Sequence, residues 1–176
     1  MSLPSIINIG SGKKYNLDYL NLDLSPKVTT DVVVDISKLE FGREYPSERF
    51  GSVVFSEEQF ESLHAHDVLE HIPDLVAAMT VCKRLLRVGG TMHVTVPYDL
   101  SLGAWQDPTH VRAFNENSWK YYDEWNWYLG WTDRLRVAKL SFRRSARADR
   151  NATLDQLLIT PRAIEAMIVE LVKQRD

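Results

Sequence analysis

The stretch SIINIGSGKKYNLDYLNLDL, residues 5–24, decides the fold of this chain. Its first apolar run stops abruptly at Gly10, which is typical of a short buried strand that ends in a tight turn. Its second run alternates apolar and polar residues up to Leu24, as a strand with one buried face does. Too few residues separate Gly12 from Asp23 for an ordinary helix, so the two predicted strands follow each other closely.

Strands and helices alternate along the rest of the chain. Apolar residues recur at helical spacing over residues 72–86, and the two glycines that follow are expected to stop this helix. A closing helix is expected over residues 160–174, with Thr160 as its N-cap and Pro161 at its first helical position. The remaining strands are predicted at residues 31–36, 60–68, 91–97 and 134–142.

The interleaved elements predict an α/β sandwich around a mostly parallel sheet. The chain has 176 residues, which suits one domain with a real core and is too short for two, so residues 1–176 are expected to form a single domain. Apolar residues make up 44% of the chain and charged residues 26%, and both values are ordinary for a soluble globular protein.

The net charge and the number of cysteines indicate which binding partners and which cellular compartment suit this chain. The net charge is -3, so no basic field attracts nucleic acid. The single cysteine, Cys82, excludes an intramolecular disulfide and suits a reducing compartment. The N-terminus lacks the features of a signal peptide, and no apolar run is long enough to cross a bilayer. We therefore expect a cytoplasmic protein that binds neither membrane nor nucleic acid.

A ligand site is expected at one edge of the sheet. In parallel α/β sheets, ligands bind at the carboxyl ends of the strands, near the point where the strand order reverses. Each of the first five predicted strands ends in a glycine-bearing or polar element. These elements are Gly10-Ser11-Gly12, Asp23, Asp35, His66-Asp67 and Pro97-Tyr98-Asp99.

The glycine turn does not match the two common phosphate-binding loops. A Walker loop needs G-x-x-x-x-G-K-[ST], and that spacing is absent. A dinucleotide fingerprint needs a third glycine where this chain has Tyr15, followed by a helix and an acid about 20 residues on, and Asp23 comes too early.

From Asn8 to Pro97 the chain resembles the class I S-adenosylmethionine-dependent methyltransferases, and above all a compact branch of them with a reduced first helix. The resemblance rests on an ordered set of motifs: the glycine turn, Asp23, Asp35, HDVLEHIPD and LLRVGG. The chain departs from the family pattern at Asn8, where an acid is common, and at Lys14, where a third glycine is common. The resemblance implies a three-layer Rossmann-like methyltransferase sandwich.

The resemblance also implies S-adenosylmethionine as cofactor. In the family the glycine turn approaches the methionine part, the acid after the second strand binds the ribose hydroxyls, and the acid after the third meets adenine. A carboxylate suits vicinal hydroxyls because it accepts two donors together, and a cationic sulfonium needs no phosphate cradle. The cofactor-binding residues expected here are Asn8, Gly10, Ser11, Gly12, Asp23, Leu24, Asp35, Ile36, His66 and Asp67.

Methyl transfer requires an aligned acceptor, and residues 98–131 are the expected substrate-side insertion or lid, because a long irregular connection is often functional. His110 is the first candidate for general base, with Asp107 orienting it, and His71 is the second. The structural alternative is that Asp107 caps a turn and His110 makes an ordinary hydrogen bond. The Trp and Tyr residues of this segment are expected in the core or in a homodimer contact, or else as aromatic walls for the acceptor.

Two further groups of residues were weighed. His64, His66 and His71 lack the H-E-x-x-H order, so we expect no metal site. The basic residues 134–150 predict either a solvated edge strand or a site for an anionic acceptor such as a nucleotide sugar or a nucleic acid, and the acidic remainder of the chain argues against broad nucleic-acid binding.

The expected function is methyl transfer to an oxygen or nitrogen of a small molecule, for instance a sugar-containing one. Two alternatives stay open: a noncatalytic protein that binds the cofactor and a partner, and an enzyme that degrades the cofactor without an acceptor.

Overall fold

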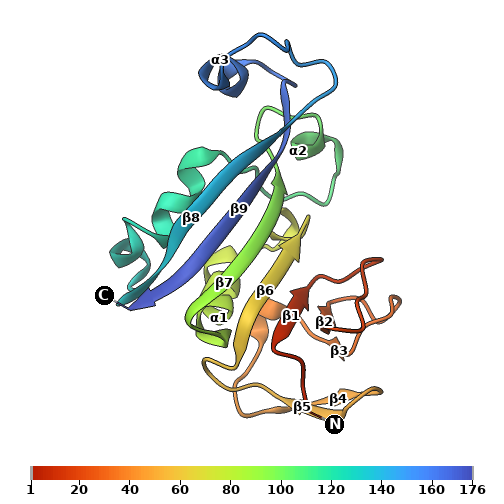
Figure 1. Ribbon diagram of the computed structural model, residues 1–176. Coiled ribbons are helices and arrows are strands. Elements are labelled where there is room, and N and C mark those ends of the chain that lie inside the picture. The colour runs from red at the N-terminus through yellow and green to blue at the C-terminus, as the bar shows by residue number, and fades with distance from the viewer. Residues whose placement is uncertain (1, 176) are drawn as a thin grey trace.

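The computed structural model describes residues 2–175, which form a seven-stranded sheet with the order β3-β2-β1-β6-β7-β9-β8 (Figure 1). Six of these strands run in one direction, and only β9 is antiparallel to its neighbours. The predicted Rossmann-like α/β fold with a mostly parallel sheet is therefore confirmed. The strands are β1 (Ile6–Ile9), β2 (Leu20–Asp23), β3 (Val32–Val33), β6 (Phe60–His66), β7 (Leu86–Pro97), β8 (Asp133–Arg144) and β9 (Ile164–Arg175), with a separate hairpin of β4 (Glu44–Ser47) and β5 (Gly51–Val54).

The helices are short apart from α1 (Leu75–Leu85). Its N-cap is Asp74, whose side chain accepts a hydrogen bond from the N–H of Ala77 at 2.9 Å. The helices other than α1 are α2 (Gly103–Gln106), α3 (Leu154–Ile159), and the 3₁₀ helices η1 (Ile36–Lys38), η2 (Leu69–His71), η3 (Glu116–Tyr122) and η4 (Asn126–Leu129). None of the helices in residues 2–175 is long and apolar enough to cross a membrane.

Two helix predictions need correction. The helix expected over residues 72–86 is confirmed in its centre, but the chain passes directly from α1 into β7, and the two glycines lie inside that strand. The helix expected over residues 160–174 is wrong. Its residues form β9, in which Met167, Val169 and Leu171 are buried in strand alternation, and Thr160 is instead the C-cap of α3.

The apolar core lies between α1 and one face of the sheet, behind the strands in Figure 1. The alternating buried residues of the strands meet the buried side of α1 and two tryptophans, Trp119 and Trp131, from the segment 98–131. These tryptophans therefore have the predicted core role, whereas Trp105 and Trp127 are about 70% exposed. The same segment contains the short helix η3, which Asn115 caps.

The opposite face of the sheet carries polar side chains in place of a layer of long helices. His64 on β6 stacks on His93 of β7 with ring centroids 4.8 Å apart, and on Tyr19 at 5.1 Å. His66 lies on the same face and contacts Thr95 at 3.1 Å. This half-buried histidine cluster is a consequence of the polar alternation in the β6 sequence.

The histidine cluster predicts a pH dependence of stability. Burial, and secondarily the proximity of His93 and His66, lowers the pKa of His64 to about 4. The unfolded chain takes up a proton near the ordinary histidine pKa of about 6.5, so it binds more protons than the native state between pH 6.5 and 4. The free energy of unfolding should therefore fall as the pH drops through this window. Urea unfolding at pH 7 and pH 5.5 should show the loss in the wild type and a smaller loss in His64→Gln; equal losses would contradict it.

Candidate active site

The carboxyl ends of β1, β2, β3 and β6 surround a cavity of about 260 Å³. The chain leaves β1 towards β2 and β3 and returns on the other side of β1 as β6, so the cavity lies at the switch point of the sheet. A larger hollow of about 690 Å³ lies away from this edge, between residues 26–33 and 46–51. Six predicted cofactor residues line the smaller cavity: Gly10, Asp23, Leu24, Asp35, Ile36 and Asp67.

Gly10 allows the loop after β6 to approach the glycine turn. Its φ is +62°, and a Cβ placed there would lie 2.3 Å from Cγ2 of Val68, which lines the cavity. A side chain at this position would therefore displace the cavity wall. The N–H of Gly12 donates to Oδ2 of Asp23 at 2.8 Å, so the turn and the end of β2 are held together. Gly10 and Asp23 thus form a compact cradle at one end of the cavity.

The two acids of the cofactor set have different surroundings. Asp23 accepts hydrogen bonds from the N–H groups of Gly12 and Ser25, and its two oxygens keep further acceptor capacity. Asp35 accepts from the N–H and the hydroxyl of Ser37 and pairs with Lys38 at 3.2 Å. Burial raises the pKa of Asp35, but the hydrogen bonds from Ser37 and Lys38 outweigh it and lower the pKa. Both walls therefore present acceptors to a ligand.

Lys14, which stands where the family often has glycine, reaches across to the loop after β6. Its Nζ lies 3.2 Å from Oδ2 of Asp67, and both side chains are at least half exposed. Asp67 has a φ of 56°, a conformation that is uncommon outside glycine. This exposed ion pair joins the glycine turn to the opposite wall of the cavity.

Four predicted cofactor residues do not line the cavity: Asn8, Ser11, Gly12 and His66. The amide of Asn8 is buried and donates to the carbonyl of Lys14 and to Oδ1 of Asn21. His66 points onto the polar face of the sheet, where it contacts Thr95. The hydroxyl of Ser11 is buried without a partner among the described residues. Through its bonds to Lys14 and Asn21, Asn8 holds the loop that follows the glycine turn against β2.

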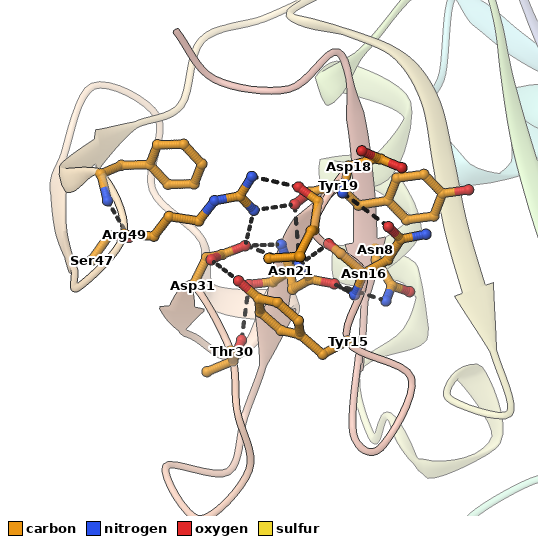
Figure 2. Close-up of polar contacts among 12 residues, drawn as sticks. Asn8, Tyr15, Asn16, Asp18, Tyr19, Asn21, Thr30, Asp31, Ser47 and Arg49 are labelled. Atoms are coloured by element: carbon orange, nitrogen blue, oxygen red, sulfur yellow. Dashed lines mark hydrogen bonds and ion pairs between the residues drawn. The ribbon is translucent and has the colours of Figure 1, made fainter. Parts of the chain in front are cut away.

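That loop, residues 11–19, replaces the first helix, and a polar network fixes it to the sheet (Figure 2). The buried carboxylate of Asp31 accepts from the backbone N–H of Asn21 at 2.8 Å, from its amide at 3.0 Å and from the hydroxyl of Tyr15 at 2.8 Å. Arg49 lies 3.6 Å from the same carboxylate and donates to the carbonyls of Leu17 and Tyr19. The sequence analysis missed this network, although the polar Asn21 in an apolar strand was a signal for it.

The three predicted acceptor-side residues meet at the mouth of the cavity. His71 lines the cavity, and its ring centroid lies 4.5 Å from that of His110. Oγ1 of Thr109 lies 2.9 Å from Nδ1 of His71 and donates to Asp107 at 2.7 Å. The carboxylate of Asp107 does not hydrogen-bond to the ring of His110, since its Oδ2 lies 4.0 Å from Nε2, and the two residues are joined only by the bond from the N–H of His110 to the carbonyl of Asp107 at 3.2 Å. Asp107 therefore orients Thr109 and, through it, His71.

The hydrogen bonds fix the tautomers of both histidines. The carbonyl of Ala104 can only accept, so the contact of 3.1 Å with Nδ1 of His110 requires a proton on that nitrogen. The hydroxyl proton of Thr109 goes to Asp107, so its oxygen accepts from Nδ1–H of His71. Each neutral ring therefore keeps a lone pair on Nε2.

Glu70 lies beside His71 and was not among the site residues predicted from the sequence. Its side chain is 1% exposed, and neither carboxylate oxygen has a hydrogen-bond partner among residues 2–175. Burial raises the pKa of Glu70 to about 7. The signal was its place in HDVLEHIPD, directly before His71, but its proximity to His110 depends on the fold.

Residues 98–131 divide into two parts. The first part contacts the loop after β6: the N–H of Val111 donates to the carbonyl of Glu70 at 2.9 Å, and Arg112 donates to the carbonyl of Pro73 at 2.7 Å. The second part, from η3 onward, supplies the core tryptophans. The first part therefore lies against the loop after β6, beside the cavity.

A second cavity, of about 460 Å³, shares Asp67 with the first. Its wall includes Arg143, Arg147 and Arg162, which come from the end of β8 and the two loops that flank α3. Residues 134–144 lie within β8, at the edge of the sheet, as the prediction of a solvated edge strand expects.

A protein-family model described as a methyltransferase domain matches residues 7–94 of this chain. These residues contain the glycine turn, both acids of the cavity, and Glu70 with His71. No curated protein matches the chain significantly.

Solved structures of similar fold include several methyltransferases. The chain is similar to an S-adenosylmethionine-dependent methyltransferase from Archaeoglobus fulgidus, with a TM-score of 0.62 and 15% identity over 97% of this chain and 86% of that one. It is similar to phosphoethanolamine N-methyltransferase 2 from Haemonchus contortus, with a TM-score of 0.58 and 14% identity over 99% of this chain and 50% of that one. The [4+2]-cyclase SpnF also shares the fold, with a TM-score of 0.60 and 13% identity over 97% and 75% of the two chains.

Proposed function

We propose that this chain, which belongs to the methyltransferase-domain family, methylates an oxygen or nitrogen of a small molecule held beside His71 and His110. The family and the cofactor class expected from the sequence, S-adenosylmethionine, are confirmed. The acceptor and the roles of individual residues belong to the proposal. The observation that carries it is the position of His71, which lines the cofactor cavity and contacts the Thr109–Asp107 pair from the segment 98–131.

The cavity residues fit the cofactor in a defined order. The Gly10 end of the cavity would hold the methionine part of the cofactor, because the missing side chain at Gly10 lets Val68 pack against the turn as a cavity wall. Asp23 would accept both ribose hydroxyls, and Asp35 with Ile36 would face adenine. S-adenosylmethionine supplies an electrophilic methyl group on a cationic sulfur. The chain's own task is then to align an acceptor and exclude water.

The reaction balances with one proton acceptor. A lone pair of the acceptor atom forms a bond to the methyl carbon while the carbon–sulfur bond breaks, and that bond's electrons stay on sulfur in neutral S-adenosylhomocysteine. The proton of the acceptor must then leave. Nε2 of His71 or of His110 can receive it, because the hydrogen bonds at Nδ1 leave both Nε2 lone pairs free.

The second cavity supports an acceptor with an anionic group. Arg143 pairs with Glu165 of the same wall at 3.4 Å, whereas Arg147 and Arg162 can bind a phosphate or carboxylate, and the cavity meets the cofactor cavity at Asp67. A sugar phosphate would span the two cavities with its hydroxyls near the cofactor. The structure of Haemonchus contortus phosphoethanolamine N-methyltransferase 2 contains phosphomonomethylethanolamine, which carries a phosphate, together with S-adenosylhomocysteine.

Two measurements test the proposal. S-adenosylhomocysteine should raise the melting temperature of the protein, and methyl-labelled S-adenosylmethionine should transfer label to acceptors from a panel of hydroxylated and phosphorylated small molecules. Loss of cofactor without an acceptor would instead favour a degrading enzyme. Binding without turnover over a broad panel would favour a noncatalytic partner protein, or a different reaction such as that of the cyclase with this fold.

A further inference from the structure

A buried carboxylate and two imidazoles converge at the mouth of the cofactor cavity. One ligand atom from each of Glu70, His71 and His110 lies within 4.8 Å of the other two. The residues come from η2 and from the segment after α2, so the fold and not the sequence order brings them together. We propose that these three side chains bind a divalent transition-metal cation.

Glu70 gives the first reason. A carboxylate that is 1% exposed and has no donor among the described residues lacks what stabilises a buried anion. The neutral imidazoles of His71 and His110, which lie near the Glu70 carboxylate, carry no positive charge to pair with it. A divalent cation would supply the missing partner.

The histidine tautomers give the second reason. Metal-ligating histidines commonly donate their other ring N–H to a carbonyl or to a group bound by a carboxylate, which fixes the ring and raises its basicity. His110 does this to the carbonyl of Ala104, and His71 does it to Thr109, which in turn donates to Asp107. The outer hydrogen bonds of a metal site are therefore already present on both rings.

The ligand set indicates the class of metal. Two imidazoles and one carboxylate suit Zn²⁺, Fe²⁺, Co²⁺ or Mn²⁺ better than Ca²⁺, which prefers oxygen ligands alone. Bond lengths of about 2.0–2.1 Å place tetrahedral ligands about 3.3 Å apart, so small side-chain rotations would close the observed cluster around an ion. Three protein ligands also leave positions open for a further group.

The open positions face the cofactor side, since His71 lines that cavity. The catalytic role of the metal rests on the proposed function, whereas its binding does not. A cation there would bind an acceptor hydroxyl and lower its pKa, so that the hydroxyl proton passes to solvent water and the alkoxide keeps lone pairs for attack on the methyl carbon. The electrons of the broken carbon–sulfur bond stay on sulfur. An amine would lose its attacking lone pair to the metal. The site therefore favours oxygen acceptors over nitrogen acceptors, and the lowered pKa of the hydroxyl makes a histidine base unnecessary.

The expectation of no metal site concerned a different set of histidines: His64, His66 and His71. His64 and His66 point onto the polar face of the sheet and pack against His93 and Thr95, whereas His71 lies with Glu70 and His110.

Cobalt binding tests the proposal directly. The metal-stripped protein should bind one equivalent of Co²⁺ with a visible absorption band that Zn²⁺ displaces. Zn²⁺ at 100 times its Kd should raise the melting temperature by about 5–10 °C. Glu70→Gln and His110→Gln should lose both signals, while His93→Gln, a histidine outside the cluster, should keep them. Glu70→Gln should also leave the metal-free protein as stable as the wild type or more stable, because it removes a buried charge.

Two results would overturn the metal site. One is no saturable binding of Co²⁺ or Zn²⁺ up to millimolar concentration. The other is binding that Glu70→Gln and His110→Gln leave unchanged. The stabilisation by S-adenosylhomocysteine, measured on the same samples, separates the two proposals: its presence without metal binding overturns the metal site alone, and its absence with metal binding overturns the proposed function alone.

Discussion

Asp23→Ala should weaken binding of S-adenosylhomocysteine by at least about 100-fold. The side chain lies at the end of β2 on the cavity wall, with acceptor capacity left beyond its bonds to Gly12 and Ser25. Two ribose hydroxyls would donate to this carboxylate, and each such charge-assisted bond contributes about 1.5–3 kcal/mol. Isothermal titration calorimetry with S-adenosylhomocysteine would measure the loss.

Asp18→Ala is a matched control for this change. Asp18 is an exposed acid on the loop that precedes β2, and it does not line the cavity. The control should bind S-adenosylhomocysteine as the wild type does. Asp23→Asn, which keeps one acceptor oxygen, should fall between the two. If Asp23→Ala bound within threefold of the wild type while it remained folded, the assignment of Asp23 to the ribose would be wrong.

The first half of the chain was predictable because its signals are local. The abrupt stop at Gly10, the alternation that ends at Asp23, and the run of valines before Asp35 each fix an element by neighbouring residues alone. Parallel strands then bring their carboxyl ends together, so the cavity follows from the strand order.

The closing segment shows where sequence patterns become ambiguous. Ile164, Met167 and Leu171 fit a helical spacing, yet Met167, Val169 and Leu171 also alternate as in a strand. Both patterns are present, and the segment forms a strand because it pairs with β7 on one side and with β8 on the other. Those partners are far away in sequence, so no local rule could select them.

The acceptor side shows the same limit for function. His110 and His71 were selected for their chemistry, and the structure places them in contact. Glu70 was not predicted, because a glutamate beside a histidine on a short helix is ordinary until the fold buries its carboxylate with no donor from residues 2–175. The burial of a charged group is a property of the folded chain, so the sequence alone could not single out Glu70.

Asp31→Ala should lower the free energy of unfolding by about 3–5 kcal/mol. The change removes the acceptor of the Asn21 backbone N–H and of the Tyr15 hydroxyl, one of several acceptors of the Asn21 amide, and the carboxylate near Arg49 (Figure 2). A chain of this size would melt about 6 °C or more below the wild type. Urea unfolding at pH 7 would measure the difference.

Tyr15→Phe provides the graded comparison, because it removes one hydrogen bond to Asp31 and keeps the buried carboxylate paired with Asn21. It should cost about 1 kcal/mol. The network ties residues 11–19 to the sheet in place of a helix, so Asp31→Ala should also weaken S-adenosylhomocysteine binding at a temperature where the variant is folded, although Asp31 does not line the cofactor cavity. A free energy of unfolding within 1 kcal/mol of the wild type would show that the loop is held by its apolar contacts, and the polar network would then lose its role as the replacement for the missing helix.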